Sequence, residues 1–110
     1  MVRILVVDDN EINRKVVFNL LKLCDIQADL AASGQEALDM TRRNFYHIIL
    51  LDHMMPQMDG IETFKRLHSE GLIDKRTTVI ALTANAITGA REEYLQIGFD
   101  DYLSKPIELK

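Results

Sequence analysis

Short runs of apolar residues alternate along the chain with longer stretches that mix apolar and polar positions. Three of these runs contain four consecutive aliphatic residues, at 4–7, 48–51 and 79–82. Continuous apolar runs of this length are typical of strands buried on both faces, as in a parallel sheet. Two further short strands are predicted at residues 27–31 and 99–103. The pattern therefore predicts five strands.

The stretches between the predicted strands have the three- and four-residue spacing of amphipathic helices. The first helix is predicted over residues 11–24 with Asn10 as its cap, and the second from Ser33-Gly34 to about Arg43. A third follows Gly60, and a fourth spans residues 85–97. The residues expected to face the core are Ile12, Val16, Val17, Leu20, Leu21 and Cys24 in the first helix, and Ile87, Ala90, Tyr94, Leu95 and Ile97 in the fourth.

Strict alternation of strand and helix predicts an α/β fold. Short connections favour a doubly wound, five-stranded parallel sheet with right-handed crossovers and helices on both faces. Such a sheet brings the carboxyl ends of its strands to one edge, where open α/β folds bind their ligands. We therefore look for chemistry at the residues that follow each strand.

Composition narrows the class of protein. The 110 residues are enough for one domain, and 13 Lys and Arg against 17 Asp and Glu give a net charge of -4. An acidic balance argues against a nucleic-acid surface. The single cysteine, Cys24, excludes an internal disulfide, and no apolar run is long enough to cross a membrane. These features predict one cytoplasmic domain over residues 1–110, without membrane contact.

Four of the predicted strands end on polar residues that suit phosphoryl chemistry. Asp8 and Asp9 follow the first strand, Asp52 the third, Thr83 the fourth and Lys105 the fifth. Three neighbouring carboxylates repel one another, so they either take up protons or bind a cation. An oxygen-only set favours magnesium, or alternatively manganese, over zinc. Because Asp52 stands alone on its strand, it is the best candidate to attack phosphorus and form an aspartyl phosphate.

Four segments carry a resemblance to a known family: ILVVDDN at 4–10, LDHMMPQMDG at 51–60, ALTANA at 81–86 and GFDDYLSKPI at 98–107. With this spacing, the chain resembles a response-regulator receiver domain of two-component signalling. The resemblance implies a flavodoxin-like sheet with strand order 2-1-3-4-5. Receivers close with a fifth helix, whereas this chain stops at Lys110, so that helix is expected to be truncated or absent and the oligomeric state is left open.

The resemblance also implies a role for each site residue. Asp52 would accept a phosphoryl group from a phosphohistidine of a histidine kinase or a histidine phosphotransfer protein. Asp9 and Asp52 would bind magnesium directly, Asp8 mainly through water, and Met54 through its backbone carbonyl. Lys105 would bind a phosphoryl oxygen.

Thr83 and Tyr102 match the pair that carries the family's switch. The hydroxyl would move toward the phosphoryl group while the ring turns inward, which would change the surface of the fourth helix and fifth strand. Such a domain catalyses only its own phosphorylation and dephosphorylation, so we expect a signalling module rather than a turnover enzyme. The segments ALTANA and DDYLSKPI are most similar to receivers of hybrid sensor histidine kinases, with a free-standing regulator as the alternative.

Other interpretations of the same residues stay open at this stage. A magnesium-dependent phosphohydrolase with an aspartyl nucleophile would need a general acid near Asp52, where Met54 stands. A flavodoxin-like cofactor binder would need a glycine-rich phosphate loop, which the chain lacks. The isolated His47, His53 and His68 are interpreted as structural residues at the surface or the sheet edge.

Overall fold

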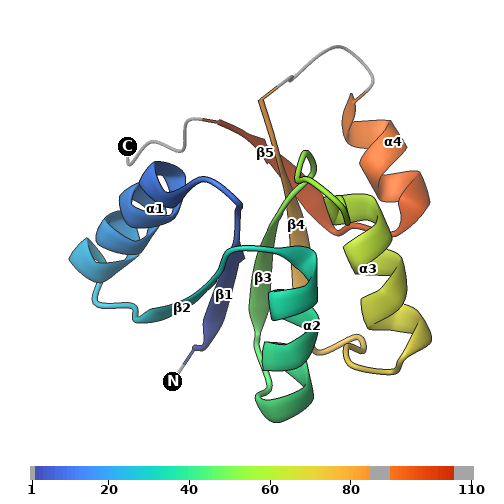
Figure 1. Cartoon of the computed structure of the whole chain (residues 1–110), viewed down its shortest axis with the longest axis horizontal. Helices are drawn as coiled ribbons and strands as arrows, with labels where there is room; N and C mark the ends of the chain where they lie inside the picture. Colours follow the sequence, from blue (N-terminus) through green and yellow to red (C-terminus); the bar gives the residue numbers. More distant parts are fainter. Residues whose placement is uncertain (1, 85–89, 106–110) are drawn as a thin grey trace.

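Five parallel strands form a single sheet in the order β2-β1-β3-β4-β5 (Figure 1). The strands are β1 (Ile4–Val7), β2 (Ala28–Ala31), β3 (Ile48–Asp52), β4 (Thr78–Thr83) and β5 (Asp101–Ser104). All four pairings between neighbouring strands are parallel. The predicted fold class and strand order are therefore confirmed.

The computed structural model describes residues 2–84 and 90–105. Two predictions extend beyond these ranges. The first five positions of the helix predicted over 85–97 lie outside the described residues, and so do residues 106–110, where the last helix of a receiver would begin.

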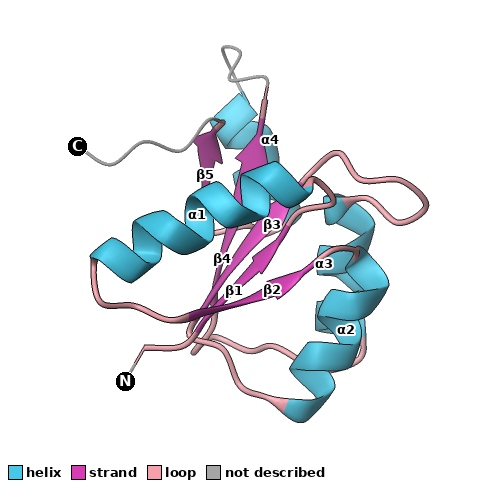
Figure 2. Ribbon diagram, turned by 60° about the vertical axis from the view of Figure 1, so that its left-hand side comes forward, coloured by secondary structure: helices cyan, strands magenta, loops and turns pink. Residues whose placement is uncertain are grey.

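The helices cover both faces of the sheet unequally (Figure 2). They are α1 (Glu11–Leu23), α2 (Gly34–Arg43), α3 (Gly60–Ser69) and α4 (Ala90–Ile97). Helix α1 packs on one face through Val17, with Phe18 and Leu21 at its border. The other three helices bury Leu38, Phe64, Leu67 and Tyr94 against the opposite face. The core thus consists of two apolar layers separated by the sheet.

The apolar face of α1 is wider than the surface that it buries. Ile12 is 71% exposed, Val16 is 41% exposed, and Cys24 is an exposed residue that caps the helix end. Their prediction as core residues was wrong, because α1 packs against the sheet through Val17, Phe18 and Leu21 instead. Leu95 of α4, 38% exposed, was misassigned in the same way.

The observed strand boundaries differ from the predicted ones at residues that are buried but not paired, or paired but not apolar. Phe99 is 3% exposed yet precedes β5, because its ring stacks on Phe64 with the centroids 4.3 Å apart. Conversely, β3 and β4 extend onto the polar residues Asp52 and Thr83. These two residues belong to the sheet itself, so their backbone positions are fixed by strand pairing.

Candidate functional site

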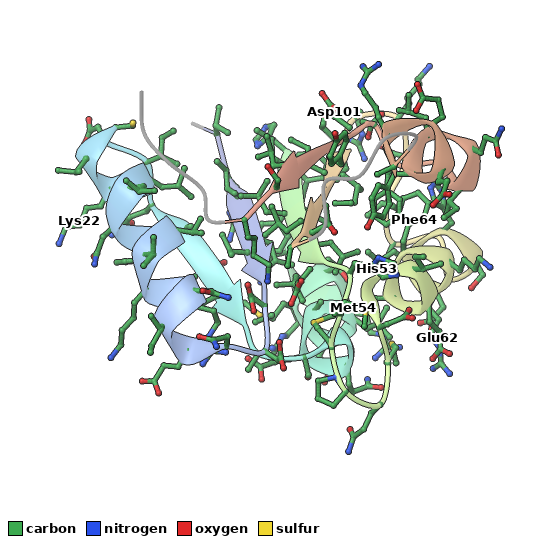
Figure 3. All side chains as sticks on the ribbon, turned by 90° about the horizontal axis from the view of Figure 1, so that it is seen from above. Lys22, His53, Met54, Glu62, Phe64 and Asp101 are labelled. Atoms are coloured by element: carbon green, nitrogen blue, oxygen red, sulfur yellow. The ribbon has the colours of Figure 1, made fainter. Side chains whose placement is uncertain are left out.

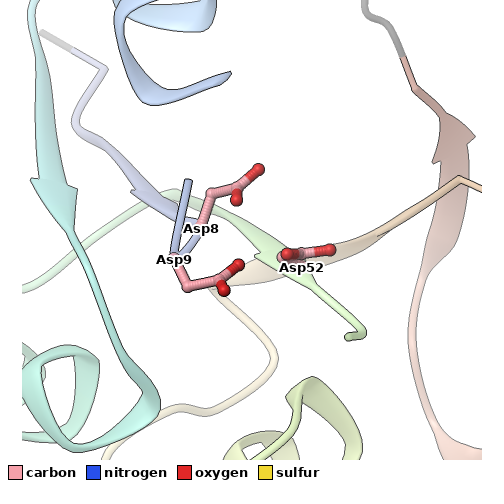
Figure 4. Close-up of side chains that lie close together, drawn as sticks. All are labelled: Asp8, Asp9 and Asp52. Carbon is pink, nitrogen blue, oxygen red and sulfur yellow. The ribbon is translucent and has the colours of Figure 1, made fainter. Parts of the chain in front are cut away.

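The strand register brings the predicted acidic residues together. Val7 pairs with Leu51, so Asp8 follows β1 beside the position at which Asp52 ends β3. Figure 4 shows the carboxylates of Asp8, Asp9 and Asp52 gathered at the carboxyl ends of these two strands. Their oxygen atoms include a set that lies within 4.8 Å of one another, which is close enough for all three to contact one cation.

Lys105 follows β5, an outer strand of the sheet, and its side chain reaches the same cluster. Its backbone N–H donates to the carbonyl of Thr83 over 2.8 Å, which continues the pairing of β4 with β5. Its Nζ lies 3.0 Å from Oδ1 of Asp52 and 3.2 Å from Oδ2 of Asp8. The carboxylates of Asp52 and Asp8 are 3% and 1% exposed, and the Lys105 side chain is 18% exposed, so a partly buried ammonium group is the counter-charge that two buried carboxylates share.

One ammonium group does not neutralise three carboxylates. Burial raises the pKa of Asp52 to about 6, and the charges of Asp8 and Asp9 add to this effect against the opposing influence of Lys105. Burial alone would lower the pKa of Lys105, but its hydrogen bonds and charge interactions with Asp52 and Asp8 raise it. The cluster keeps a formal charge of about -2 when all its groups are ionised. It therefore favours a divalent cation.

Contacts within the first turn of α1 fix the orientation of Asp8. The N–H of Asn10 donates to Oδ1 of Asp8 over 2.9 Å, and Asn10 also caps the helix by accepting from the N–H of Asn13. The guanidinium group of Arg14 donates to the carbonyl of Asp8 over 2.8 Å. The sequence gives no sign of this role of Arg14, because a contact with a main-chain carbonyl leaves no pattern in the sequence.

Gly60 is a second residue whose role emerges only in three dimensions. Its N–H donates to the carbonyl of His53 over 2.8 Å, and a Cβ at this position would collide with the carbonyl of Asp52. The loop between β3 and α3 therefore folds back against the end of β3. Asp59 caps α3 by accepting from the N–H of Glu62, which fixes the helix start beside the site.

The residues predicted as a switch lie on the neighbouring strands β4 and β5. Thr83 is 5% exposed at the end of β4. The half-buried Tyr102 pairs with Ala81, and its ring stacks on Tyr94 of α4 at a centroid distance of 6.0 Å. Met54 follows the cluster with its side chain 71% exposed. Figure 3 shows Met54 and His53 on the segment that leaves β3 toward α3.

The three histidines make structural contacts. Nδ1 of His47 accepts from the N–H of Arg3, His53 hydrogen-bonds Tyr94, and the ring of His68 lies edge-on to Phe64. None of them belongs to the group of possible cation ligands found among residues 2–84 and 90–105. Their interpretation as structural residues is consistent with these contacts.

The family model described as the response regulator receiver domain matches residues 4–110. The chain belongs to this family. This receiver domain is 37% identical over 110 residues to hybrid signal transduction histidine kinase G of Dictyostelium discoideum. It is 38% identical over 105 residues to the signal transduction histidine-protein kinase BarA of Escherichia coli. The alignments cover 98% and 96% of the receiver domain but only 3% and 11% of those two kinases.

Solved structures show the same fold. The receiver domain of the Francisella response regulator 1452 matches with a TM-score of 0.87 and 34% identity, over 98% of this chain and 87% of that one. A second match, with a TM-score of 0.85 and 28% identity, is the co-crystal structure of the Saccharomyces cerevisiae histidine phosphotransfer protein Ypd1 with the receiver domain of Ssk1. It covers 97% of this chain and 80% of that chain. Within the described part of this receiver, no helix is long and apolar enough to span a membrane.

Proposed function

We propose that this receiver domain accepts a phosphoryl group on Asp52 from a phosphohistidine. The main observation behind the proposal is that the side chains of Asp8, Asp9, Asp52 and Lys105 form one cluster at the carboxyl ends of the strands. A carboxylate held between two acidic neighbours and one ammonium group has both a nucleophilic oxygen and a charge partner for an incoming phosphoryl group. Family membership favours this function over the phosphohydrolase and the cofactor binder.

The transfer exchanges one bond to phosphorus for another. An oxygen of Asp52 forms the new O–P bond in line with the P–N bond that breaks, and the imidazole of the donor leaves with the bonding electrons and takes up a proton. Lys105 contacts Asp52 and Asp8 directly. In the reaction, its ammonium group pairs with a phosphoryl oxygen and offsets the negative charge that the transfer brings in.

The cofactor that fits this donor set is Mg²⁺, with Mn²⁺ as the alternative. All the candidate ligands are oxygens, and three of them come from carboxylates that lie within 4.8 Å of one another. Asp9 and Asp52 would bind the ion directly, Asp8 mainly through water, and Met54 through its carbonyl. When bound, the ion would supply positive charge to the phosphoryl oxygens and relieve repulsion among the carboxylates.

The phosphorylated domain acts as a switch. Thr83 donates its hydroxyl to the phosphoryl group, Tyr102 turns inward, and the surface of α4 and β5 changes for a downstream partner. The domain catalyses its own phosphorylation and dephosphorylation and turns over no separate substrate, so it is a signalling module rather than an enzyme. The unit that does this corresponds to residues 1–110.

The partner that we propose is a histidine kinase or a histidine phosphotransfer protein. The similarity to hybrid kinases supports a place as the receiver of a longer kinase that relays phosphate onward, and a free-standing regulator is the alternative. A co-crystal structure of a similar receiver with a phosphotransfer protein supports direct docking of the two domains. We place the domain in the cytoplasm, without contacts to nucleic acid or membrane.

Phosphoramidate tests the proposed donor chemistry because it carries the P–N bond of phosphohistidine. Incubation with phosphoramidate and Mg²⁺ should produce one slower band in phosphate-affinity electrophoresis, and EDTA should abolish it. The matched control is Asp59→Asn, which removes a carboxylate of the helix cap outside the acidic cluster and should leave the band. The same band in Asp52→Asn would refute the assignment.

A further inference from the structure

A hydrogen bond connects the residue that follows Asp52 with helix α4. Nδ1 of His53 lies 2.7 Å from the hydroxyl of Tyr94, and the two rings meet edge-on with centroids 5.5 Å apart. Tyr94 is 6% exposed and His53 is half-buried, so the contact is partly shielded from solvent. An internal hydrogen bond of this kind contributes to the relative stability of the arrangement in which it forms.

The backbone of His53 is fixed on both sides. Its N–H donates to the carbonyl of Leu82 on β4 over 3.0 Å, and its carbonyl accepts from the N–H of Gly60 at the start of α3 over 2.8 Å. The residue after Asp52 is therefore tied to β4 and α3 through its main chain, and to α4 through its ring. If α4 is displaced, either the hydrogen bond between His53 and Tyr94 breaks or the ring of His53 moves with the helix.

Tyr94 also contacts the ring of Tyr102 on β5. The Tyr94 and Tyr102 rings are stacked with centroids 6.0 Å apart and planes 24° apart. Tyr94 also meets Phe99 edge-on at 5.6 Å. A cavity of about 230 Å³ lies beside Tyr94, lined also by His53 and Thr83 among others. The ring of Tyr94 therefore borders free volume in which it can rearrange.

We infer that His53 and Tyr94 are positioning residues whose hydrogen bond holds α4 and Tyr102 in the arrangement seen here. This inference rests on the proposed function, in which Tyr102 turns inward when Asp52 is phosphorylated. In that proposal Tyr102 leaves its present position against Tyr94, and Tyr94 is held by His53. The hydrogen bond therefore opposes the switch, and its loss favours the phosphorylated arrangement.

Beryllofluoride with Mg²⁺, which mimics a phosphoryl group on a carboxylate, provides the test. Tyr94→Phe keeps the ring and removes the hydroxyl, so it should bind the mimic about two- to tenfold more tightly, the range given by one buried hydrogen bond. In protein labelled with 3-fluorotyrosine, the ¹⁹F signal of Tyr102 should already be shifted toward its position in the beryllofluoride complex. A purely structural role for Tyr94 would not move this signal in that direction.

Tyr46→Phe is the matched control. Tyr46 is also buried, at 2% exposure, and its hydroxyl donates to Asp29 over 2.6 Å. Because it loses a comparable hydrogen bond away from the acidic cluster, it should become less stable without changing its affinity for beryllofluoride. His53→Phe removes the other partner of the hydrogen bond and provides a second variant if Tyr94→Phe does not fold.

The outcomes separate the two proposals. If the wild-type domain does not bind beryllofluoride, the proposed function fails and this inference fails with it. If the wild type binds and Tyr94→Phe or His53→Phe binds with unchanged affinity, only the inference is overturned. If both single variants and the double variant show the same increase in affinity, the effect is assigned to this hydrogen bond.

Discussion

Replacing Asp52 with Asn should make the metal-free domain more stable at neutral pH. Asp52 is 2% exposed and lies in a cluster where three carboxylates share one ammonium group. Folding therefore buries a negative charge among others of the same sign. An amide of nearly the same shape removes this charge and can still accept a hydrogen bond from Lys105.

The magnitude follows from the raised pKa. The pKa of Asp52 rises from 3.8 to about 6 on folding, because burial and the charges of Asp8 and Asp9 outweigh the effect of Lys105. Each pKa unit corresponds to about 1.4 kcal/mol, so ionisation of Asp52 lowers the free energy of unfolding by ~3 kcal/mol when the pH exceeds about 6. Asp9 of the cluster is exposed, and screening of its charge by water reduces the expected effect to about 1 to 2 kcal/mol.

The sign of the pH dependence is fixed by the direction of the shift. Between pH 3.8 and about 6 the folded state holds a proton on Asp52 that the unfolded state releases, so stability falls as the pH rises through this window. The loss is complete above the folded pKa and absent below the unfolded one. Asn does not titrate, so its advantage should be largest near neutral pH and should shrink toward about pH 4.

Urea unfolding followed by circular dichroism, with EDTA present, measures the free energy of unfolding of the wild type and of Asp52→Asn at neutral pH and at about pH 4. Asp74→Asn is the control with the opposite sign, because hydrogen bonds from Arg76 lower the pKa of Asp74 and its loss should not stabilise the protein. Mg²⁺ should then reverse the order by stabilising the wild type more than Asp52→Asn. Equal stability of the two proteins at neutral pH without metal, or a gain that persists in acid, would refute the electrostatic reasoning.

Three further outcomes follow from the same geometry. Mg²⁺ affinity measured by calorimetry should fall as the pH drops through about 6, since the ion must displace the proton held by Asp52; a flat profile would contradict this. Lys105→Gln should destabilise the metal-free protein by about 2 kcal/mol in urea unfolding at neutral pH, because Asp8 and Asp52 lose their shared counter-charge, and an unchanged midpoint would count against the buried pair. Gly60→Ala should lower both the melting temperature and the extent of phosphorylation by acetyl phosphate, because its Cβ collides with the carbonyl of Asp52; normal values of both would argue against close approach of the loop.

The sequence predicted the sheet and its polar edge because both depend on local signals. Runs such as Ile4–Val7 contain only aliphatic residues, so both faces of the strand are expected to be buried. Parallel pairing then aligns the residue after each run at one edge. Asp8, Asp9, Asp52 and Lys105 meet as that argument required. Magnesium binding and the individual roles of these residues remain predictions, which the experiments above address.

Burial and contacts between distant elements were less predictable. Ile12 and Val16 have the spacing of a core-facing helix, yet α1 is exposed along their side because only part of its apolar surface meets the sheet. Periodicity reports which residues share a face, not whether another element covers that face. The link from His53 to Tyr94 joins residues 41 positions apart, so only the folded chain brings them together. The link from Arg14 to Asp8 is local, but a contact with a main-chain carbonyl leaves no pattern in the sequence.

The most direct test of the central claim is to locate the phosphoryl group itself. The wild-type domain is treated with acetyl phosphate and Mg²⁺, reduced with borohydride to trap the acyl phosphate, digested, and mapped by tandem mass spectrometry. We predict one modified residue, Asp52, and no modification when EDTA replaces the metal. Modification of a different carboxylate, or the same yield at Asp52 without a divalent ion, would contradict the account.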